Sequence, residues 1–152
     1  MPEDFSELER TAGALLRSLS PAERRGLLRK MARTLQRSQS ARIAAQRNPD
    51  GSAYEPRKPQ PLRQRSGGVR RKAMFTALRR AKHLQAGSDD RSLWVGFSGR
   101  ASRIASIHQF GLRDRPSPGS RPVDYAKRIL VGFTMSEEDI LMDLLFRHFE
   151  GA

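Results

Sequence analysis

The three histidines are the first residues to consider for chemistry, because a neutral imidazole can act as a general base or bind a metal. His83, His108 and His148 lie far apart in the sequence, and none has a metal-ligand spacing to a second histidine or a carboxylate. His108 falls near the end of a predicted helix, where a cation or a donor to the last carbonyls is favourable. We therefore predict a structural role for His108, and the same reasoning applies to His148.

The acidic residues form no evident catalytic pair. Glu137–Asp139 open the last predicted helix, where capping and the helix dipole explain them. Asp89–Asp90 and Asp114 are the internal candidates for a nuclease or a cell-wall hydrolase, and they lie in turn-like sequence contexts. The chain has no cysteine, and it lacks a glycine-rich phosphate loop and a nucleophile elbow. We predict a protein that is not an enzyme and that has no metal or other cofactor.

Positive charge is concentrated in one segment of this 152-residue chain, whose net charge is +13. Residues 17–82 contain 19 basic and 3 acidic residues, whereas residues 83–152 contain 9 of each. An anionic partner should therefore contact the first of these segments. The residues that we expect to make this contact are Arg24, Arg25, Arg29, Arg33, Arg37, Arg42, Arg57, Lys58, Arg63 and Arg65.

The basic segment has three interpretations, and the sequence leaves all three open. It can be a solvated helix face followed by a disordered loop, a contact for nucleic-acid phosphates, or a contact for an acidic protein. Only Tyr54 and Phe75 are aromatic within it, which disfavours base-specific or single-strand recognition. Non-specific contact with nucleic acid remains compatible with it.

Two helices are expected at the start of the chain. Apolar residues at helical spacing predict the first over residues 2–18. Ser20 can cap a second helix, Pro21 suits its first turn, and Glu23 can reach back to complete a capping box. This second helix should run to about Arg47. Its apolar stripe is narrow, so most of its surface must face water or an anion.

The sequence predicts turns, a loop and a hairpin in the middle of the chain. Asn48–Gly51 predicts a turn. We expect residues 48–70 to form an extended, mobile basic loop. A helix is expected over residues 69–82. Two short strands, residues 83–87 and 92–97, should follow with a turn at Asp89–Asp90. Strand alternation and the neighbouring turns predict that Trp94 and Phe97 are core residues rather than ligand-binding groups.

The last third is expected to contain two helices separated by a loop and an extended segment. The predicted elements are a helix over residues 99–110 stopped by Gly111, a loop over 112–122, a strand or extended segment over 125–133, and a final helix capped by Ser136. No apolar run approaches 18 residues, which argues against a membrane span. An acidic start argues against a signal peptide.

These elements predict an α+β fold with long N-terminal helices, a small antiparallel or mixed sheet and a C-terminal helix. We expect one domain over residues 1–152. Residues 1–47 would be helical and basic, 48–70 an extended basic loop, and 71–150 a small α/β core with a second loop at 112–122.

Several segments together resemble the phage virion morphogenesis family, whose members are also described as tail-completion proteins. The segments are the Pro49-Asp50-Gly51 turn with Tyr54 and Pro56 after a basic helix, Leu93–Phe97 ending in Val-Gly, Ile104–Gly111 with its His-Gln-aromatic-Gly pattern, and Tyr125–Phe133 before an acidic helix start. The family usually has Pro-Ala-Arg where this chain has Tyr125-Ala126-Lys127, so that element departs from the pattern. The resemblance extends from about Ser20 to Phe149, and the order and spacing of the segments carry it.

The resemblance implies a structural protein of the virion that acts at the head-proximal end of a contractile or related tail. It implies rings in the neck, expected to be hexameric, that finish the tail tube and sheath and prepare the tail to join a filled head. The implied partners are copies of the chain, tail tube and sheath proteins, neck or connector proteins and, as a further contact, packaged DNA. Assembly would take place in the host cytoplasm. Under this interpretation, we expect charge reversal at Arg33, Arg37 and Arg42 to block assembly or joining. The alternative is a non-specific nucleic-acid-binding protein acting through residues 17–82.

Overall fold

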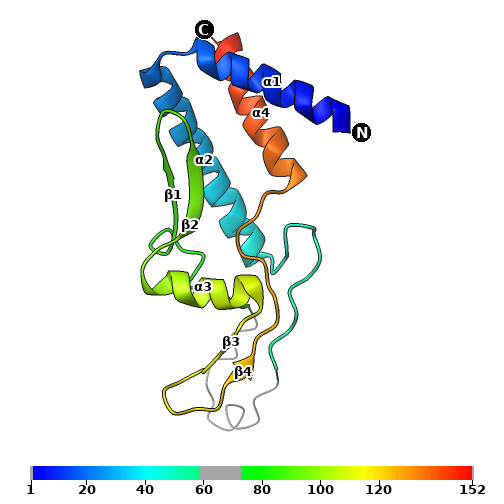
Figure 1. Ribbon diagram of the computed structural model, residues 1–152, viewed down its shortest axis with the longest axis vertical. Helices are drawn as coiled ribbons and strands as arrows, with labels where there is room; N and C mark the ends of the chain where they lie inside the picture. The colour runs from blue at the N-terminus through cyan, green and yellow to red at the C-terminus, as the bar shows by residue number, and fades with distance from the viewer. Residues whose placement is uncertain (1, 59–72, 152) are drawn as a thin grey trace. The chain divides into compact units, whose positions relative to one another are not determined.

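The computed structural model describes residues 2–58 and 73–151 (Figure 1), except for the side chains of residues 2–6 and Leu8. The chain divides into two compact units. Unit 1 consists of Met1–Ser38, Ala86–Val95 and Phe133–Ala152. Unit 2 consists of Gln39–Gln85 and Gly96–Gly132. The division falls within helix α2 and within the first hairpin. The predicted single domain over residues 1–152 stays a prediction.

Helices α1 (Pro2–Ser18) and α2 (Pro21–Ala44) confirm the expected helical start. The predicted capping box is present at the start of α2. The Ser20 backbone N–H donates to Glu23 Oε2 over 3.0 Å, and the Glu23 N–H donates to Ser20 Oγ over 3.2 Å. The helix ends at Ala44, before the predicted Arg47, because Gln46 adopts a left-handed backbone conformation with φ 59°.

The core of unit 1 lies between α2 and α4 (Met135–Glu150). These two helices run side by side in opposite directions over the first part of α2 (Figure 1). Leu27, Leu28 and Met31 of α2 are buried against Leu145 of α4. Partly buried apolar residues pack around this cluster: Ala12, Leu15, Leu16, Leu19, Leu93, Leu141, Met142, Leu144 and Phe149. The stripe of α2 is therefore narrow, as its sequence predicts, and its opposite face is left to solvent.

The predicted hairpin is present as β1 (Leu84–Ser88) and β2 (Leu93–Phe97), which form an antiparallel two-stranded sheet. The prediction that Trp94 lies in the core is wrong, because its side chain is 54% exposed. Successive strand residues point to opposite faces, and Leu93 takes the face that packs on the core. The Trp94 ring instead lies over Gly87, where an added Cβ would be 2.4 Å from it.

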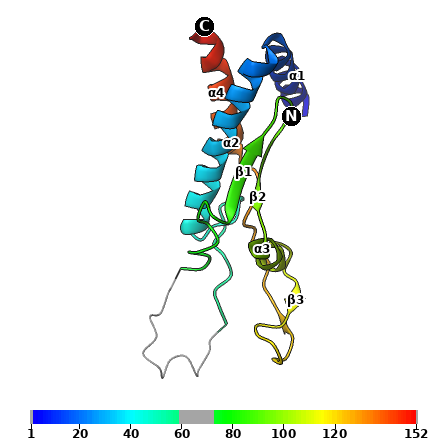
Figure 2. The same cartoon turned by 90° about the vertical axis from the view of Figure 1, so that its left-hand side faces the viewer.

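Helix α3 (Arg100–Phe110) in unit 2 ends as predicted at Gly111, whose φ of 61° is left-handed. The predicted loop over residues 112–122 is only partly correct. Its first residues form β3 (Arg113–Asp114; Figure 2), which pairs with β4 (Val123–Asp124) in an antiparallel hairpin (Figure 1). Arg113 lies opposite Asp124 in this register. Residues 125–133 contain no strand. Of the two alternatives predicted for them, a strand or an extended segment, the extended segment is correct.

The helix predicted over residues 69–82 is wrong for residues 73–82, which form turns, while 69–72 lie outside the described residues. Phe75 has φ 66°, which a right-handed helix does not admit. Both backbone groups of Met74 are bound by the Gln46 side chain. The Met74 N–H donates to Oε1 over 2.7 Å, and Nε2 donates to the Met74 carbonyl over 2.9 Å. The preceding turn at Asn48–Gly51 is present as predicted, and the rest of the 48–70 loop from residue 59 is not described.

The final helix α4 is capped by Thr134, so the prediction of Ser136 as the cap is wrong by two residues. Thr134 Oγ1 accepts a hydrogen bond from the Glu137 N–H over 3.0 Å, and Glu137 Oε2 accepts one from the Thr134 N–H over 3.2 Å. Glu137 is only 2% exposed and also accepts a 2.8 Å hydrogen bond from Ser38 Oγ. Glu137 and Glu138 lie in the first turn, which Asp139 follows. The predicted α+β class is confirmed.

The cap of α4 can be tested with two neighbouring substitutions. We expect Thr134→Ala to lower the free energy of unfolding by about 1 kcal/mol, because it removes the acceptor of the Glu137 N–H. Ser136→Ala, on the helix surface, should change it by less than about 0.5 kcal/mol. Urea denaturation followed by circular dichroism measures both. A larger loss for Ser136→Ala than for Thr134→Ala would contradict the observed cap.

Candidate interaction site

Four arginines of α2 form a row along its exposed face: Arg25, Arg29, Arg33 and Arg37, hereafter the arginine row. They are spaced four residues apart, which places them on one side of the helix about 6 Å from one another along its axis. None of them forms an ion pair with another described residue. Glu23, the one acid of α2, is bound to the Ser20 N–H.

The arginine row carries an electrostatic cost that a partner can remove. Like charges four residues apart in a helix destabilise it by roughly 0.2–0.5 kcal/mol per pair, so the row costs about 1 kcal/mol. A carboxylate or a phosphate would convert this repulsion into charge-assisted hydrogen bonds, which guanidinium groups form with both oxygens of such an anion. The row is therefore suited to bind an anionic surface, whether of protein or of nucleic acid.

The other residues predicted to contact a partner differ in exposure. Arg24 is half-buried, and its Nε has no hydrogen-bond partner among the described residues. Arg57 and Lys58 are exposed, and Lys58 Nζ donates to the Asp124 carbonyl over 3.2 Å. Arg63 and Arg65 lie outside the described residues. Of the residues predicted to contact a partner, the arginine row is thus the group that is exposed along a single helix, α2.

Arg42 has a different role, since its guanidinium is bound within unit 2. Nη1 donates to the carbonyls of Arg47 and Ile129, each over 3.1 Å, and Nη2 donates to Leu130 over 2.9 Å. These bonds fix the extended segment 125–133 against the end of α2. Arg42 is therefore a positioning residue, and its inclusion in a charge-reversal variant would combine a structural defect with a change of surface charge.

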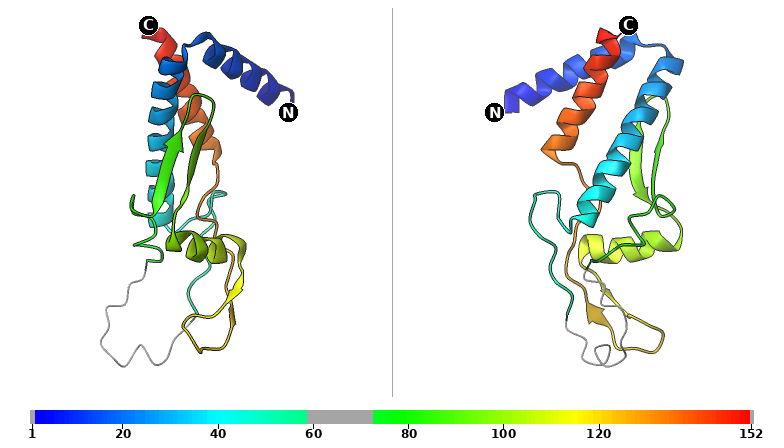
Figure 3. Two further views of the ribbon diagram at one scale, coloured as in Figure 1. Left: turned by 60° about the vertical axis from the view of Figure 1, so that its left-hand side comes forward. Right: turned by 180° about the vertical axis from the view of Figure 1, so that it is seen from behind.

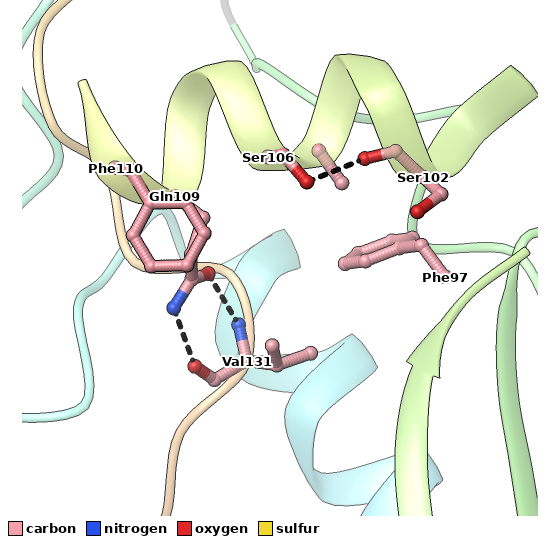
Figure 4. Close-up of a pocket in the computed structure, with 7 residues that line it drawn as sticks. Phe97, Ser102, Ser106, Gln109, Phe110 and Val131 are labelled. Atoms are coloured by element: carbon pink, nitrogen blue, oxygen red, sulfur yellow. Dashed lines mark hydrogen bonds between the residues drawn. The ribbon is translucent and has the colours of Figure 1, made fainter. Parts of the chain in front are cut away.

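Side chains, rather than a neighbouring strand, satisfy the backbone of residues 129–131. Earlier in the same segment, the N–H groups of Tyr125 and Arg128 donate to the carbonyls of Leu112 and His108. The Ile129 N–H donates to Asn48 Oδ1 over 2.9 Å. Gln109 binds the next two residues through its amide (Figure 4). Its Oε1 accepts from the N–H groups of Leu130 and Val131, and its Nε2 donates to the Val131 carbonyl over 2.9 Å. The sequence reasoning did not identify these roles, although Asn48 and Gln109 fall within the segments that carry the family resemblance.

Arg128 and His108 lie together in unit 2. Arg128 is only 5% exposed and donates to the carbonyls of Glu55 and Pro56 over 2.7 and 3.1 Å. The His108 ring contacts Phe75 and Tyr125 edge-on, with centroids 4.8 and 5.2 Å away. Burial, with the positive charges of Arg128 and Arg57, lowers the pKa of His108 to about 4. His108 is therefore neutral at pH 7 and is not a cation at the helix end, whereas the predicted structural role of His108 stays a prediction.

A shallow pocket beside α3 is mainly apolar. Its lining residues are Phe97, Ser102, Ala105, Ser106, Gln109, Phe110 and Val131 (Figure 4). No titratable residue lines it. Ser106 Oγ already donates to the Ser102 carbonyl over 2.9 Å, and Gln109 is bound to Val131. Such a pocket has no group for acid–base chemistry and suits an apolar side chain.

Two of the three internal acids that could have suggested an enzyme, Asp89 and Asp114, have structural partners. Asp89 Oδ1 accepts from the N–H groups of Arg91 and Ser92, and these bonds lower the pKa of its carboxyl. Asp114 pairs with Arg103 over 2.6 Å. Within residues 2–58 and 73–151, no three histidine or acidic residues are grouped so as to hold a metal ion. The helices in these same ranges are too short or too polar to cross a membrane.

The positioning role of Arg42 predicts a contrast with Arg37, which lies on the same helix. We expect Arg42→Met to lower the free energy of unfolding by about 2 kcal/mol, because buried carbonyls lose their donors. Arg37→Met, an exposed position, should change it by less than about 0.5 kcal/mol. Urea denaturation compares the two variants. Equal effects would contradict the structural assignment of Arg42.

The lowered pKa of His108 predicts how stability depends on pH. The unfolded chain protonates His108 near its ordinary pKa of 6.5, whereas the folded protein does so near 4. The unfolded state therefore binds more protons in this window, and stability is lost as the pH falls from 6.5 towards 4. The free energy of unfolding of the wild type, minus that of His108→Gln, should be smaller at pH 5 than at pH 7. A constant difference would contradict a neutral His108.

Comparison with known proteins agrees with the resemblance seen in the sequence. The model of the phage virion morphogenesis family matches residues 3–150. The chain is 36% identical over 149 residues to the tail completion protein S of Escherichia phage P2, and the match covers 97% of this chain and 98% of that protein. No solved structure gave a significant match. The chain therefore belongs to the phage virion morphogenesis family.

Proposed function

We propose that this protein completes the phage tail at its head-proximal end and so enables the tail to join a filled head. The similarity to the tail completion protein S of Escherichia phage P2 carries the proposal, because it covers nearly the whole of both chains. The protein would then be a virion component of the tail or neck, assembled in the cytoplasm of the bacterial host.

The proposed role is structural rather than enzymatic. Two of the three acids that could serve a hydrolase, Asp89 and Asp114, are bound in structural contacts. His108 lacks a carboxylate or nucleophile among its ring contacts, which are to Phe75 and Tyr125. The function would thus depend on surfaces that recognise other proteins.

Assembly in this role would use copies of the chain arranged as a ring, expected to be hexameric. A ring built from one kind of contact requires two different surfaces on each subunit. The further partners would be tail tube and sheath proteins on one side and neck or connector proteins on the other. Contact with packaged DNA would be an additional property of the basic segment.

A second candidate function is non-specific nucleic-acid binding through residues 17–82. The arginine row favours it, because exposed arginines without acidic neighbours are suited to bind phosphates. The two candidates differ in what they require. Nucleic-acid binding needs only a polyanion and predicts an affinity that falls steeply with salt, whereas tail completion needs specific protein neighbours.

The first test is electron microscopy of lysates from a phage genome that lacks this reading frame. We expect full heads beside unattached or abnormally finished tails, because tail completion precedes joining. Supplying the gene from a plasmid should restore infectious particles. Intact and infectious virions in the absence of the gene would overturn the proposal and leave nucleic-acid binding as the first candidate.

A further inference from the structure

The solvent-facing side of α4 combines acidic and large apolar residues in one stripe. Its members, spaced four, four, three and four residues apart, are Met135, Asp139, Asp143, Phe146 and Glu150, hereafter the α4 stripe. All are exposed, with Met135 at 74% and Phe146 at 38%. With 3.6 residues per turn, Asp139, Asp143 and Glu150 lie about 120–160° around the helix from Leu145, and Met135 and Phe146 lie about 80–100° from it. Leu145 is buried in the core of unit 1. Figure 3 shows α4 from two sides.

The composition of this stripe indicates a protein partner. Exposed phenylalanine and methionine among carboxylates are not explained by solubility, and such residues are enriched at protein interfaces. One internal ion pair is present, between Arg147 Nε and Asp143 Oδ2 at 2.9 Å. Both of its side chains are exposed, so the pair contributes little and leaves Asp143 able to bind a second cation. Nucleic acid would be repelled by the carboxylates.

The arginine row matches the α4 stripe in length and in chemistry. The row extends about 18 Å from Arg25 to Arg37, and the acids extend about 16 Å from Asp139 to Glu150. Guanidinium groups can bind the carboxylates in bidentate form and lie against the ring of Phe146. Both surfaces belong to unit 1, and within one copy no arginine of the row is paired with an acid of the stripe among the described residues.

We propose that the arginine row of one copy docks on the α4 stripe of the next copy. The contact is heterologous, since it joins two different faces, and repeating it generates a ring if the rotation closes. It would relieve the repulsion within the row and cover the exposed Phe146 and Met135. The ring itself rests on the proposed function, whereas the contact between copies can be measured separately.

Charge exchange between the two helices tests this contact. One variant carries Arg29→Glu, Arg33→Glu and Arg37→Glu, a second carries Asp143→Arg and Glu150→Arg, and a third combines both sets. Each is supplied to the phage genome that lacks the gene, and infectious particles are counted. We expect each set alone to reduce the yield about 100-fold or more, because like charges then face each other. The combined variant should recover at least about tenfold over either set alone.

The control reverses exposed charges of unit 1 outside both surfaces, with Arg17→Glu and Arg91→Glu, and should leave the yield unchanged. The contact would be overturned by the following pattern. The three arginine substitutions lower the yield, the two α4 substitutions do not, and the combined variant recovers no yield. That pattern would assign the arginine row to DNA or to another acidic protein. Circular dichroism of each purified variant shows whether it is folded.

A disulfide experiment decides the matter independently of yield, because the chain contains no cysteine of its own. Cells producing phage would contain two tagged copies, one with Arg33→Cys and the other with Asp143→Cys, and their extracts would be oxidised. A disulfide-linked dimer should form in the mixture and not with Arg33→Cys or Asp143→Cys alone. Absence of the mixed dimer would overturn the contact even if tail completion itself is confirmed by the deletion phenotype.

Discussion

Hydrogen bonds from side chains to the backbone of residues 125–133 are the constraint on which unit 2 depends. An extended segment without a neighbouring strand must find partners for its amides and carbonyls, since leaving them unpaired in the interior is costly. Arg42, Asn48 and Gln109 supply those partners from three different parts of the chain. A chain with a low apolar content thereby holds an irregular structure without a large sheet.

Unit 1 is constrained in a different way, because its hydrophobic core is thin. The stripe of α2 can bury only one face against α4, so the arginine row must face solvent in a single copy. The α4 stripe is exposed for the equivalent reason, because its helix also offers one face to the core. Two helices that share a narrow core thus present two different outer surfaces, which is compatible with the proposed head-to-tail contact.

The family membership and the physical features of the chain support one another. A structural role explains why candidate catalytic groups are engaged in turns and ion pairs, as with Asp89 and Asp114. It also accounts for surface features that are unfavourable in a monomer, namely like charges four residues apart and exposed aromatic rings. In the proposed contact between copies, the basic charge of α2 would serve an interface.

The sequence by itself determined the features that depend on neighbours along the chain. The capping box at Ser20 and Glu23, the hairpin turn and the end of α3 at Gly111 all rest on hydrogen bonds between residues a few positions apart. The uneven distribution of charge was equally readable, because it requires no coordinates.

Only the tertiary structure decided which groups are engaged by distant parts of the chain. Gln46 binds Met74, 28 positions away in the sequence, and so prevents the helix expected there. The guanidinium group of Arg42 donates to the Leu130 carbonyl and is therefore not available to a partner. The neutral state of His108 and the exposure of Trp94 likewise follow from what packs around each ring. Periodicity and propensity carry no information about these contacts, because they join residues that only folding brings together.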